Sequence, residues 1–420
     1  MTINGKRQYE LLNKIGFIRV SGSEDELKAA HILMDEIKSL GLDPTLDRFK
    51  VDESQIVEAK LCVTEPYQKE YHVTAYKCCG NCDLEGEFYY AQEATNKVDL
   101  ANIKDKIVLV NGYLRLGTYK KLIESGAKAF ITFQGTLLEE NNNQDLDTRK
   151  LRSMLRKYGV IPGVNMMVSD ALDLVVNGAK KVKMTIKQEE CEVTSHNVYA
   201  TIEGTENKDE RIVFGAHFDS VPFSTGVYDN GAGSVIIMDI LREFVANPPK
   251  RTVQFCWFGS EEVGLEGSKH YTKTYQKLLD QTRLMINVDV AGSPLGKDVA
   301  MVTGPTDLVS YIDYLACQEN FSINASQDLY SSDSTPFADK GIPSVSFCRF
   351  GASGSAFIHC RHDIIKYLTP EALENTCTFV NKFAQDIVNS PVFPVKKEMP
   401  EEMVKKIDEY LDNPKKQKTS

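Results

Sequence analysis

The sequence predicts an α/β protein in which helices flank a mixed, mainly parallel sheet and a smaller β-rich α/β domain is inserted. Two observations support this prediction. From residue 191, apolar runs typical of buried strands alternate with helical segments, which is the pattern of a parallel sheet covered on both faces. Between residues 51 and 190, shorter strand-like runs are separated by turns, which indicates a second domain with its own core.

The first fifty residues predict two packing helices. One is expected near the N-terminus, and the second begins in SGSEDELKAA, where Ser23 and Glu26 have the spacing of a capping box. Gly41 ends this helix, and Pro44 prevents it from resuming.

The segment from 51 to 190 predicts short strands at VEAKLCVT, EYHVTAY, GEFYYA and KIVLVNGY. A helix at TYKKLIESGAK follows, and then strands at AFITF and VIPGVNMMVS and a helical stretch around DALDLVV. Such a mixture is typical of a small β-rich α/β domain.

From residue 191, strands are expected at HNVYATIEG, RIVFGAHF, TVQFCWFG, RLMINVDV, AMVTG and PSVSFC. Helices between and after them are GAGSVIIMDILREFVAN, LEGSKHYTKTYQKLL, TDLVSYIDYLACQ and residues 370–388. This order predicts a mainly parallel sheet. Residues 396–420 predict a short charged helix, which packs on the body of the protein or on a neighbouring subunit, and then a disordered tail.

Length and composition exclude several classes of protein. The 420 residues suffice for two or three domains, and the net charge of −10 disfavours a nucleic-acid binder. The N-terminus, MTINGKRQYELLNKIGFIRV, lacks the apolar core of a signal peptide, and no apolar run is long enough to cross a bilayer. We therefore expect a soluble, cytoplasmic protein without a membrane partner.

Ten cysteines in a long chain without a secretion signal predict free thiols rather than a disulfide framework. Cys78, Cys79 and Cys82 form the one cluster, in CCGNC. A structural zinc site needs more ligands than this cluster offers, and the other cysteines are scattered. We interpret the cluster as ordinary thiols.

Polar residues stand where the predicted strands end, and open α/β sheets place their sites at such ends. In AHFDS, His217 and Asp219 share one strand face, so Asp219 can orient the ring of His217. Asp229, in YDNGAGS, can bridge two metal ions, but taken alone it is better explained as a helix N-cap. Asp289 closes an apolar strand, where a carboxylate is costly without a partner.

Glu261 and Glu262 directly follow the strand TVQFCWFG and must point in different directions. One can bind a metal ion while the other accepts a proton from metal-bound water. A histidine completes the set: His359 is the first candidate and His362 its competitor. Asp363 can orient His359. Asp333, in SSDSTPF, can also contact the site. Imidazole and carboxylate ligands suit Zn²⁺ and leave room for Co²⁺ or Mn²⁺.

Five motifs in order resemble those of the co-catalytic di-zinc aminopeptidases, the bacterial leucyl-type and aminopeptidase Y group: AHFDS, YDNGAGS, GSEEVGLEGS, NVDVAG and IHCRHD. SGSEDELKAA resembles the start of that family. KIVLVNGY, TYKKLIESGAKAFITF and IPGVNMMVSDA resemble the protease-associated domain that many members carry. The resemblance implies a zinc-exopeptidase fold, with a discontinuous catalytic domain over 1–50 and 191–395, the protease-associated domain over 51–190, and a C-terminal helix and tail over 396–420.

The resemblance also implies roles for residues and two zinc ions per chain. His217, Asp229 and Asp289 would bind one metal, and Glu262 and His359 would complete the set of the other, with Asp229 bridging. Asp219 would support His217, and Glu261 would be the general base. A cis peptide is implied between Asp229 and Asn230.

Three positions depart from the family pattern. Ile358 stands where some relatives have a tyrosine that helps the oxyanion, Cys360 where threonine is common, and Ser334 where histidine or tyrosine is frequent. These differences leave the metal ligands intact and concern substrate recognition.

The motifs therefore predict a zinc-dependent exopeptidase, foremost an aminopeptidase acting on peptides. A carboxypeptidase or an N-acyl amino-acid hydrolase with the same metal core is the alternative. It would need an arginine or lysine in the cleft for the substrate carboxylate, which Arg349 or Arg361 could supply. A non-catalytic binding protein of the same fold is a third interpretation. The sequence leaves open whether the chain forms a homo-oligomer.

Overall fold

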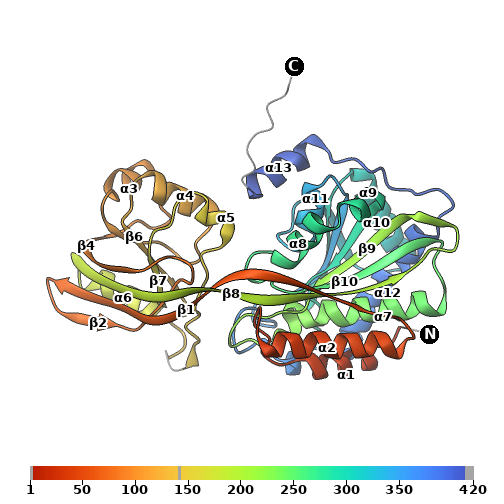
Figure 1. Ribbon diagram of the computed structural model, residues 1–420, viewed down its shortest axis with the longest axis horizontal. Helices are drawn as coiled ribbons and strands as arrows, with labels where there is room; N and C mark the ends of the chain where they lie inside the picture. The colour runs from red at the N-terminus through yellow and green to blue at the C-terminus, as the bar shows by residue number, and fades with distance from the viewer. Residues whose placement is uncertain (1–2, 141–142, 412–420) are drawn as a thin grey trace, which may run out of the picture. The chain divides into compact units, whose positions relative to one another are not determined.

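The computed structural model describes residues 3–140 and 143–411. The chain forms two compact units, and Figure 1 labels many of their elements. The first unit comprises Met1–Val51 and Thr194–Ser420, and the second comprises Asp52–Val193. The chain passes between the units within two long strands, β1 (Thr45–Glu65) and β8 (Lys181–Ile202).

The first unit is built on a mixed, mainly parallel sheet, which confirms the predicted fold class. Its strand order is β13-β12-β14-β11-β9-β10-β8, and neighbours run parallel from β14 to β10. β12 lies antiparallel to β14 and parallel to β13, and β8 lies antiparallel to β10. The strands are β9 (Asn207–His217), β10 (Arg251–Phe258), β11 (Thr282–Val288), β12 (Gly296–Thr303), β13 (Ile323–Gln327) and β14 (Ser344–Gly351).

Helices cover both faces of this sheet. Successive side chains of a strand point to opposite faces, so each strand contributes apolar side chains to two separate cores. In β9, Phe214 belongs to the larger hydrophobic core and Val213 to a smaller one. The larger core includes α1 (Gly5–Ile15), α2 (Glu24–Ser39), α7 (Ala232–Ala246), α10 (Thr306–Gln318) and α12 (Pro370–Asn389); the smaller includes α8 (Glu266–Thr274), α9 (Gln276–Gln281) and α11 (Ser334–Asp339).

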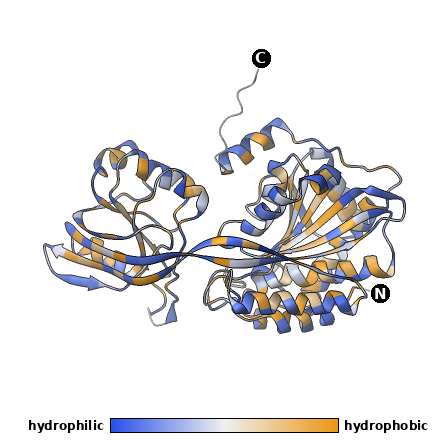
Figure 2. Cartoon of the chain, viewed as in Figure 1, coloured by the Kyte–Doolittle hydropathy of each residue, from blue (hydrophilic) through white to orange (hydrophobic). Residues whose placement is uncertain are grey.

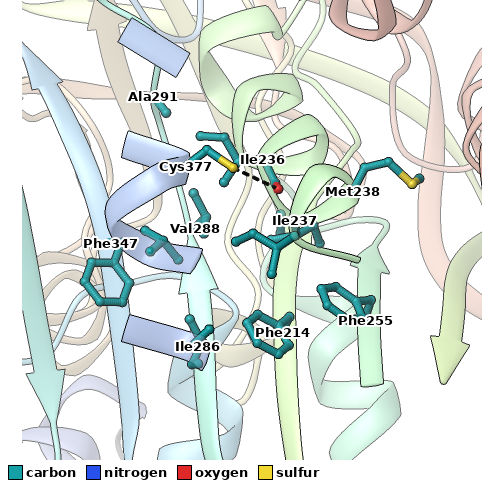
Figure 3. Close-up of a cluster of buried hydrophobic side chains, with 14 of the residues drawn as sticks. Phe214, Ile236, Ile237, Met238, Phe255, Ile286, Val288, Ala291, Phe347 and Cys377 are labelled. Carbon is teal, nitrogen blue, oxygen red and sulfur yellow. Dashed lines mark hydrogen bonds between the residues drawn. The ribbon is translucent and has the colours of Figure 1, made fainter. Parts of the chain in front are cut away.

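The larger core packs α7 and α12 against the strands of the sheet. Figure 3 shows Phe214 and Ile286, from neighbouring strands, grouped with Ile236 of α7. Phe214 stacks on Phe255 with ring centroids 4.5 Å apart, and Cys377 of α12 donates a weak hydrogen bond from Sγ to the carbonyl oxygen of Ile236 at 3.7 Å. The strands of this unit are mostly apolar (Figure 2). Burying one such side chain contributes about 1.5–3 kcal/mol, so the sheet is a firm base for the residues that follow it.

Three local features differ from the sequence predictions. The segment LEGSKHYTKTYQKLL forms two helices, because the chain leaves the helical conformation at Tyr275, with φ −103° and ψ 46°. β13 is an additional strand, and its sequence INASQ contains no apolar run that would predict it. In α2, Ser23 Oγ accepts from the backbone N–H of Glu26 at 3.1 Å as predicted, but the Glu26 carboxylate accepts from Gly22 rather than from Ser23.

The second unit has its own hydrophobic core around four parallel strands in the order β4-β5-β6-β7. β3 pairs antiparallel with β7, and β4 pairs antiparallel with the first part of β8. Its other elements are β2 (Lys69–Tyr71), β3 (Val73–Ala75), β4 (Cys82–Tyr90), α3 (Lys97–Asn102), β5 (Ile107–Leu109), α4 (Leu116–Glu124), β6 (Ala129–Gln134), α5 (Ser153–Arg156), β7 (Gly163–Met167) and α6 (Val168–Val176).

The predicted C-terminal helix is α13 (Glu401–Leu411), which buries Met403 and Ile407 and contacts α11. The predicted disordered tail lies outside the described residues. All ten cysteines are free thiols, as predicted. Across residues 3–140 and 143–411, no helix has the length and apolarity that a membrane span requires.

Candidate metal centre

Three adjacent strands of the first unit bring the predicted ligands together. His217 is the last residue of β9, Asp289 directly follows β11, and Glu261 and Glu262 follow the turn after β10. Because β9 lies between β10 and β11 and runs parallel to both, the carboxyl ends of the three strands meet at one edge of the sheet.

Asp229 lies in the turn η2 (Val227–Gly231), immediately before α7, and its backbone is not helical there, with φ −120° and ψ 89°. The peptide bond between Asp229 and Asn230 is cis, as the family resemblance implied. His359 lies in the loop that follows β14, the strand next to β11.

The distances join these residues into two sets around one shared carboxylate. Nε2 of His217 lies 3.2 Å from Oδ1 of Asp229 and 3.6 Å from Oδ1 of Asp289. Nε2 of His359 lies 3.2 Å from Oδ2 of Asp229 and 3.0 Å from Oε2 of Glu262. Asp229 thus offers one oxygen to each histidine, which is the arrangement of a carboxylate between two cations.

The ligand atoms of three triads lie within 4.8 Å of one another: His217 with Asp229 and Asp289, Asp229 with Glu262 and His359, and His217 with Glu261 and Glu262. Oδ1 of Asp289 is buried and accepts no hydrogen bond from the described residues. A buried carboxylate oxygen without a hydrogen bond is costly unless a cation faces it, so the donor set fits divalent metal ions. In the described part of the chain, no such triad contains a cysteine.

The electrostatics show how much positive charge this cluster requires. The charge of Glu262 raises the pKa of His359 to about 12, against the effect of burial. Burial and the charge of Glu262 raise the pKa of Glu261 well above its usual range. Burial would also raise the pKa of Asp229, but hydrogen bonds from His217 and His359 lower it. The carboxylates of this cluster thus favour positive charge on the groups beside them, as they would favour bound cations.

Asp219 supports the centre in two ways. Its Oδ1 lies 3.4 Å from Nδ1 of His217, on the side of the ring that faces away from Asp229. Its two oxygens also accept from the backbone N–H groups of Glu261 at 3.0 Å and Glu262 at 3.3 Å. The fully buried Asp219 carboxylate therefore fixes the turn that presents both glutamates.

Two other side chains hold ligands in place. Asn230 donates to the carbonyl oxygen of Val288 at 2.8 Å and accepts from the N–H groups of Gly233 and Val290, which ties the Asp229 turn to the end of β11. Ser332 Oγ donates to Oδ2 of Asp289 at 2.5 Å.

The secondary candidates have different fates. Asp333 is fully buried, and burial raises its pKa to about 7, while the charge of His217 lowers it and the charge of Asp289 raises it. Its contact with the ligands stays a prediction. The ring of His362 packs against Phe357 with centroids 5.6 Å apart, and His362 is in no ligand triad of the described residues. The hypothesis that Asp363 orients His359 is not supported: the Asp363 carboxylate accepts from the backbone of the Asp229 turn.

The Arg349 side chain makes its contacts within the protein. It forms an ion pair with the buried Asp298 and donates to the carbonyl oxygens of Ser293 at 2.6 Å and Pro294 at 3.1 Å. Ser334 Oγ lies 2.9 Å from Oγ of Ser346, in a buried pair. Neither side chain is available to a substrate.

The sequence alone does not reveal two neighbours of the centre. Arg19 is fully buried and donates to backbone carbonyl oxygens on the segment between His217 and Asp229. A lone arginine inside the apolar run FIRV is the only sign of it. Tyr330 is half-buried, and burial and the charge of Asp289 raise its pKa. Nothing in its local sequence distinguishes Tyr330.

Comparison with known proteins identifies relatives of this chain. Residues 197–384 match the model of Peptidase family M28. Aminopeptidase YwaD of Bacillus subtilis is 26% identical over 417 residues, which cover 92% of this chain and 84% of that protein. The solved structure of BSAP, a zinc aminopeptidase from Bacillus subtilis, has a TM-score of 0.75 at 23% identity and covers 96% of this chain and 99% of that one. An aminopeptidase from Aneurinibacillus sp. strain AM-1 gives 0.74 at 23% identity, with coverages of 94% and 96%.

Proposed function

We propose that this chain, a member of peptidase family M28 in agreement with its motifs, is a zinc-dependent aminopeptidase that releases N-terminal residues from peptides. The observation that carries the proposal is the position of Asp229 between His217 and His359, with a further glutamate, Glu261, beside the pair. The names of the relatives, an aminopeptidase and a zinc aminopeptidase, agree with this chemistry.

We assign two zinc ions to the centre. His217, Asp229 and Asp289 would hold one, and Asp229, Glu262 and His359 would hold the other. Bound zinc would polarise the scissile carbonyl group and lower the pKa of a water molecule.

The protein's own residues would then do the following. Glu261 accepts the proton of the attacking water, because it is the carboxylate that lies beside the two ligand sets without belonging to either of them. It passes that proton to the leaving amine. Asp219 keeps His217 oriented and keeps the backbone of Glu261 in place. The excess of carboxylates at the centre favours a substrate with a protonated α-amine.

The alternative of a carboxypeptidase or an N-acyl amino-acid hydrolase is less favoured by the contacts. Such an enzyme needs a cation for the substrate carboxylate, and Arg349 is already paired with Asp298. Arg361 is exposed in the loop after His359 and stays the other candidate. R361A therefore tests this alternative: it should leave activity on free-amine substrates intact.

Further proposals concern the rest of the chain. The second unit would be a protease-associated domain, because its sequence resembles one between 106 and 171. Ten free thiols suit a reducing compartment, which supports a cytoplasmic location. The net charge of −10 argues against nucleic acid as a partner.

Elemental analysis combined with a substrate panel tests the function. The purified protein should contain about two zinc ions per chain, and it should cleave aminoacyl substrates with a free amine but not the same substrates with a blocked amine. A chelator should abolish cleavage, and added zinc should restore it. Activity confined to blocked-amine substrates would refute the aminopeptidase. Size-exclusion chromatography of the same preparation reports whether the chain forms a homo-oligomer.

A further inference from the structure

His359 lies in a long loop, outside any strand or helix. The loop begins after Gly351, the last residue of β14, and ends at Asp363. The His359 side chain is 48% exposed, and its backbone has φ +56°. The distance from His359 to Asp229 therefore depends on how the loop is anchored rather than on a strand or helix of its own.

Tyr228, the residue before Asp229, anchors the start of the loop. The Tyr228 side chain is buried, and its hydroxyl donates to the carbonyl oxygen of Arg349 at 2.7 Å and accepts from the backbone N–H of Gly351 at 2.9 Å. The loop thus leaves β14 attached to the turn that carries Asp229. Leu295 adds contacts to the first half of the loop, where its carbonyl oxygen accepts from the backbone N–H of Ala352.

Asp363 anchors the end of the loop to the same turn. Oδ1 accepts from the backbone N–H of Tyr228 at 2.8 Å, and Oδ2 lies 3.3 Å from the backbone N of Asp229 and 3.2 Å from Oγ of Ser224. The carbonyl oxygen of Asp363 accepts from Thr225 Oγ1 at 2.6 Å. The residue is 1% exposed, so water does not replace these contacts.

Arg19 holds the other side of the Asp229 turn. It donates to the carbonyl oxygens of Thr225 and Gly226, while Asp363 accepts from the N–H groups of Tyr228 and Asp229. The charge of Asp363 is the strongest of those that raise the pKa of Arg19 against the effect of burial. The turn therefore lies between a buried cation that binds its carbonyl groups and a buried anion that binds its amide groups.

We propose that Asp363 is a positioning residue for the metal centre. By binding the backbone of Tyr228 and Asp229, it sets the distance between His359 and the carboxylate that both ligand sets share. The inference rests on the proposed function in that it takes zinc to be the metal at the centre. Asp363 lies four residues after His359 in the chain. It acts not on His359 itself but on Asp229, the ligand that faces His359.

Zinc titration of D363N, without substrate, tests this inference. Asparagine keeps the shape of the side chain but offers only one acceptor oxygen to three donors, so the turn should shift away from His359. We expect one of two zinc ions to bind about 10- to 100-fold more weakly in competition with a chromophoric chelator, as for other losses of a group that orients a ligand. The ion held by His217 and Asp289 should lose less affinity, because adjacent strands fix those two ligands and only Asp229 would shift.

Two further variants separate positioning from general stability. Y228F removes only the hydroxyl contacts at the start of the loop. It should weaken the binding of the same zinc ion, the one held by His359 and Glu262. D239N is the matched control: Asp239 is 1% exposed and accepts from Asn4, Arg7 and Gln8 in the same unit. It should lower the melting temperature and leave both zinc affinities unchanged.

Each outcome decides the inference. Wild-type zinc affinities in D363N, or an equal loss in D239N, would overturn it. If D363N fails to fold, Y228F decides by the same titration. A wild-type protein that binds two zinc ions but releases no N-terminal residues would refute the proposed function and leave the titration valid. A wild-type protein that binds no zinc would overturn both.

Discussion

Replacing Arg19 by methionine should destabilise the first unit strongly. The guanidinium is completely buried, and although burial lowers its pKa to about 10, it stays charged at neutral pH. It donates hydrogen bonds to backbone carbonyl groups of two segments that are distant in sequence, the region around the end of α1 and the stretch between β9 and Asp229. These carbonyl groups belong to Ile15, Phe17, Phe218, Thr225 and Gly226.

The magnitude follows from what each carbonyl oxygen retains. Ile15 keeps a hydrogen bond from Phe17, and Gly226 keeps one from Gly231 at 2.8 Å. Among the residues that the structure describes, the carbonyl oxygens of Phe17, Phe218 and Thr225 accept from no donor other than Arg19. An unsatisfied buried acceptor costs about 1–3 kcal/mol, and the apolar contacts of methionine offset part of the sum. We expect a loss of about 3–5 kcal/mol, the range for removing one partner from a buried charged network.

Urea unfolding followed by tryptophan fluorescence measures this loss of stability in the first unit, the one that contains Arg19. Trp257 is the single tryptophan of the chain, lies in β10, and is fully buried with its Nε1–H bonded to the carbonyl oxygen of Ser234. R19K should retain part of the stability, since an ammonium group reaches fewer carbonyl groups. K382M is the control, because it removes a half-exposed i,i+4 ion pair that contributes less than about 1 kcal/mol. If R19M unfolded at the same urea concentration as K382M, the buried carbonyl contacts would not stabilise this turn.

Three further results are expected. E261Q should lower kcat by about 10²- to 10⁴-fold with little change in zinc content, measured by steady-state kinetics and elemental analysis, because it removes a base and keeps the side-chain shape. S332A should weaken zinc binding about 10-fold in chelator competition, because Asp289 loses the hydroxyl that orients it. Burial raises the pKa of Glu26, so its contribution to stability is present below the ordinary glutamate pKa of about 4.3 and is lost as pH rises through the folded value. As pH rises through that value, the urea midpoint of E26Q should therefore fall less than the midpoint of the wild type. Identical pH profiles of the two proteins would contradict this.

The predicted site residues that the structure brings together share one property: most lie at or just after the end of a strand. His217 ends its apolar strand, Glu262 and Asp289 follow theirs, and the alternation of those strands with helices predicts that the residues meet at one edge of a parallel sheet. The resemblance of five motifs to a known family selects His359 over His362. β13 escapes prediction because only its pairing with β12 makes it a strand.

The residues that the sequence does not explain act through backbone groups. The sequence suggests that Asp363 orients His359, its near neighbour in the chain, but its carboxylate binds the N–H groups of Tyr228 and Asp229. No pattern of side-chain types indicates which main-chain amide a buried carboxylate will reach, since this depends on the path of two loops that are distant in sequence. Arg19 escapes sequence reasoning for the same reason.

This distinction has a consequence for the two proposed metal positions. His217 and Asp289 are attached to adjacent parallel strands, so the sheet itself sets their separation. His359 is attached to a loop, and the contacts of Tyr228 and Asp363 relate that loop to Asp229. The ion bound by His359 and Glu262 should therefore be the more easily lost of the two, and the one whose affinity changes when buried residues outside the ligand set are altered. A metal centre of this design has one position that the fold determines and one that a few buried hydrogen bonds determine.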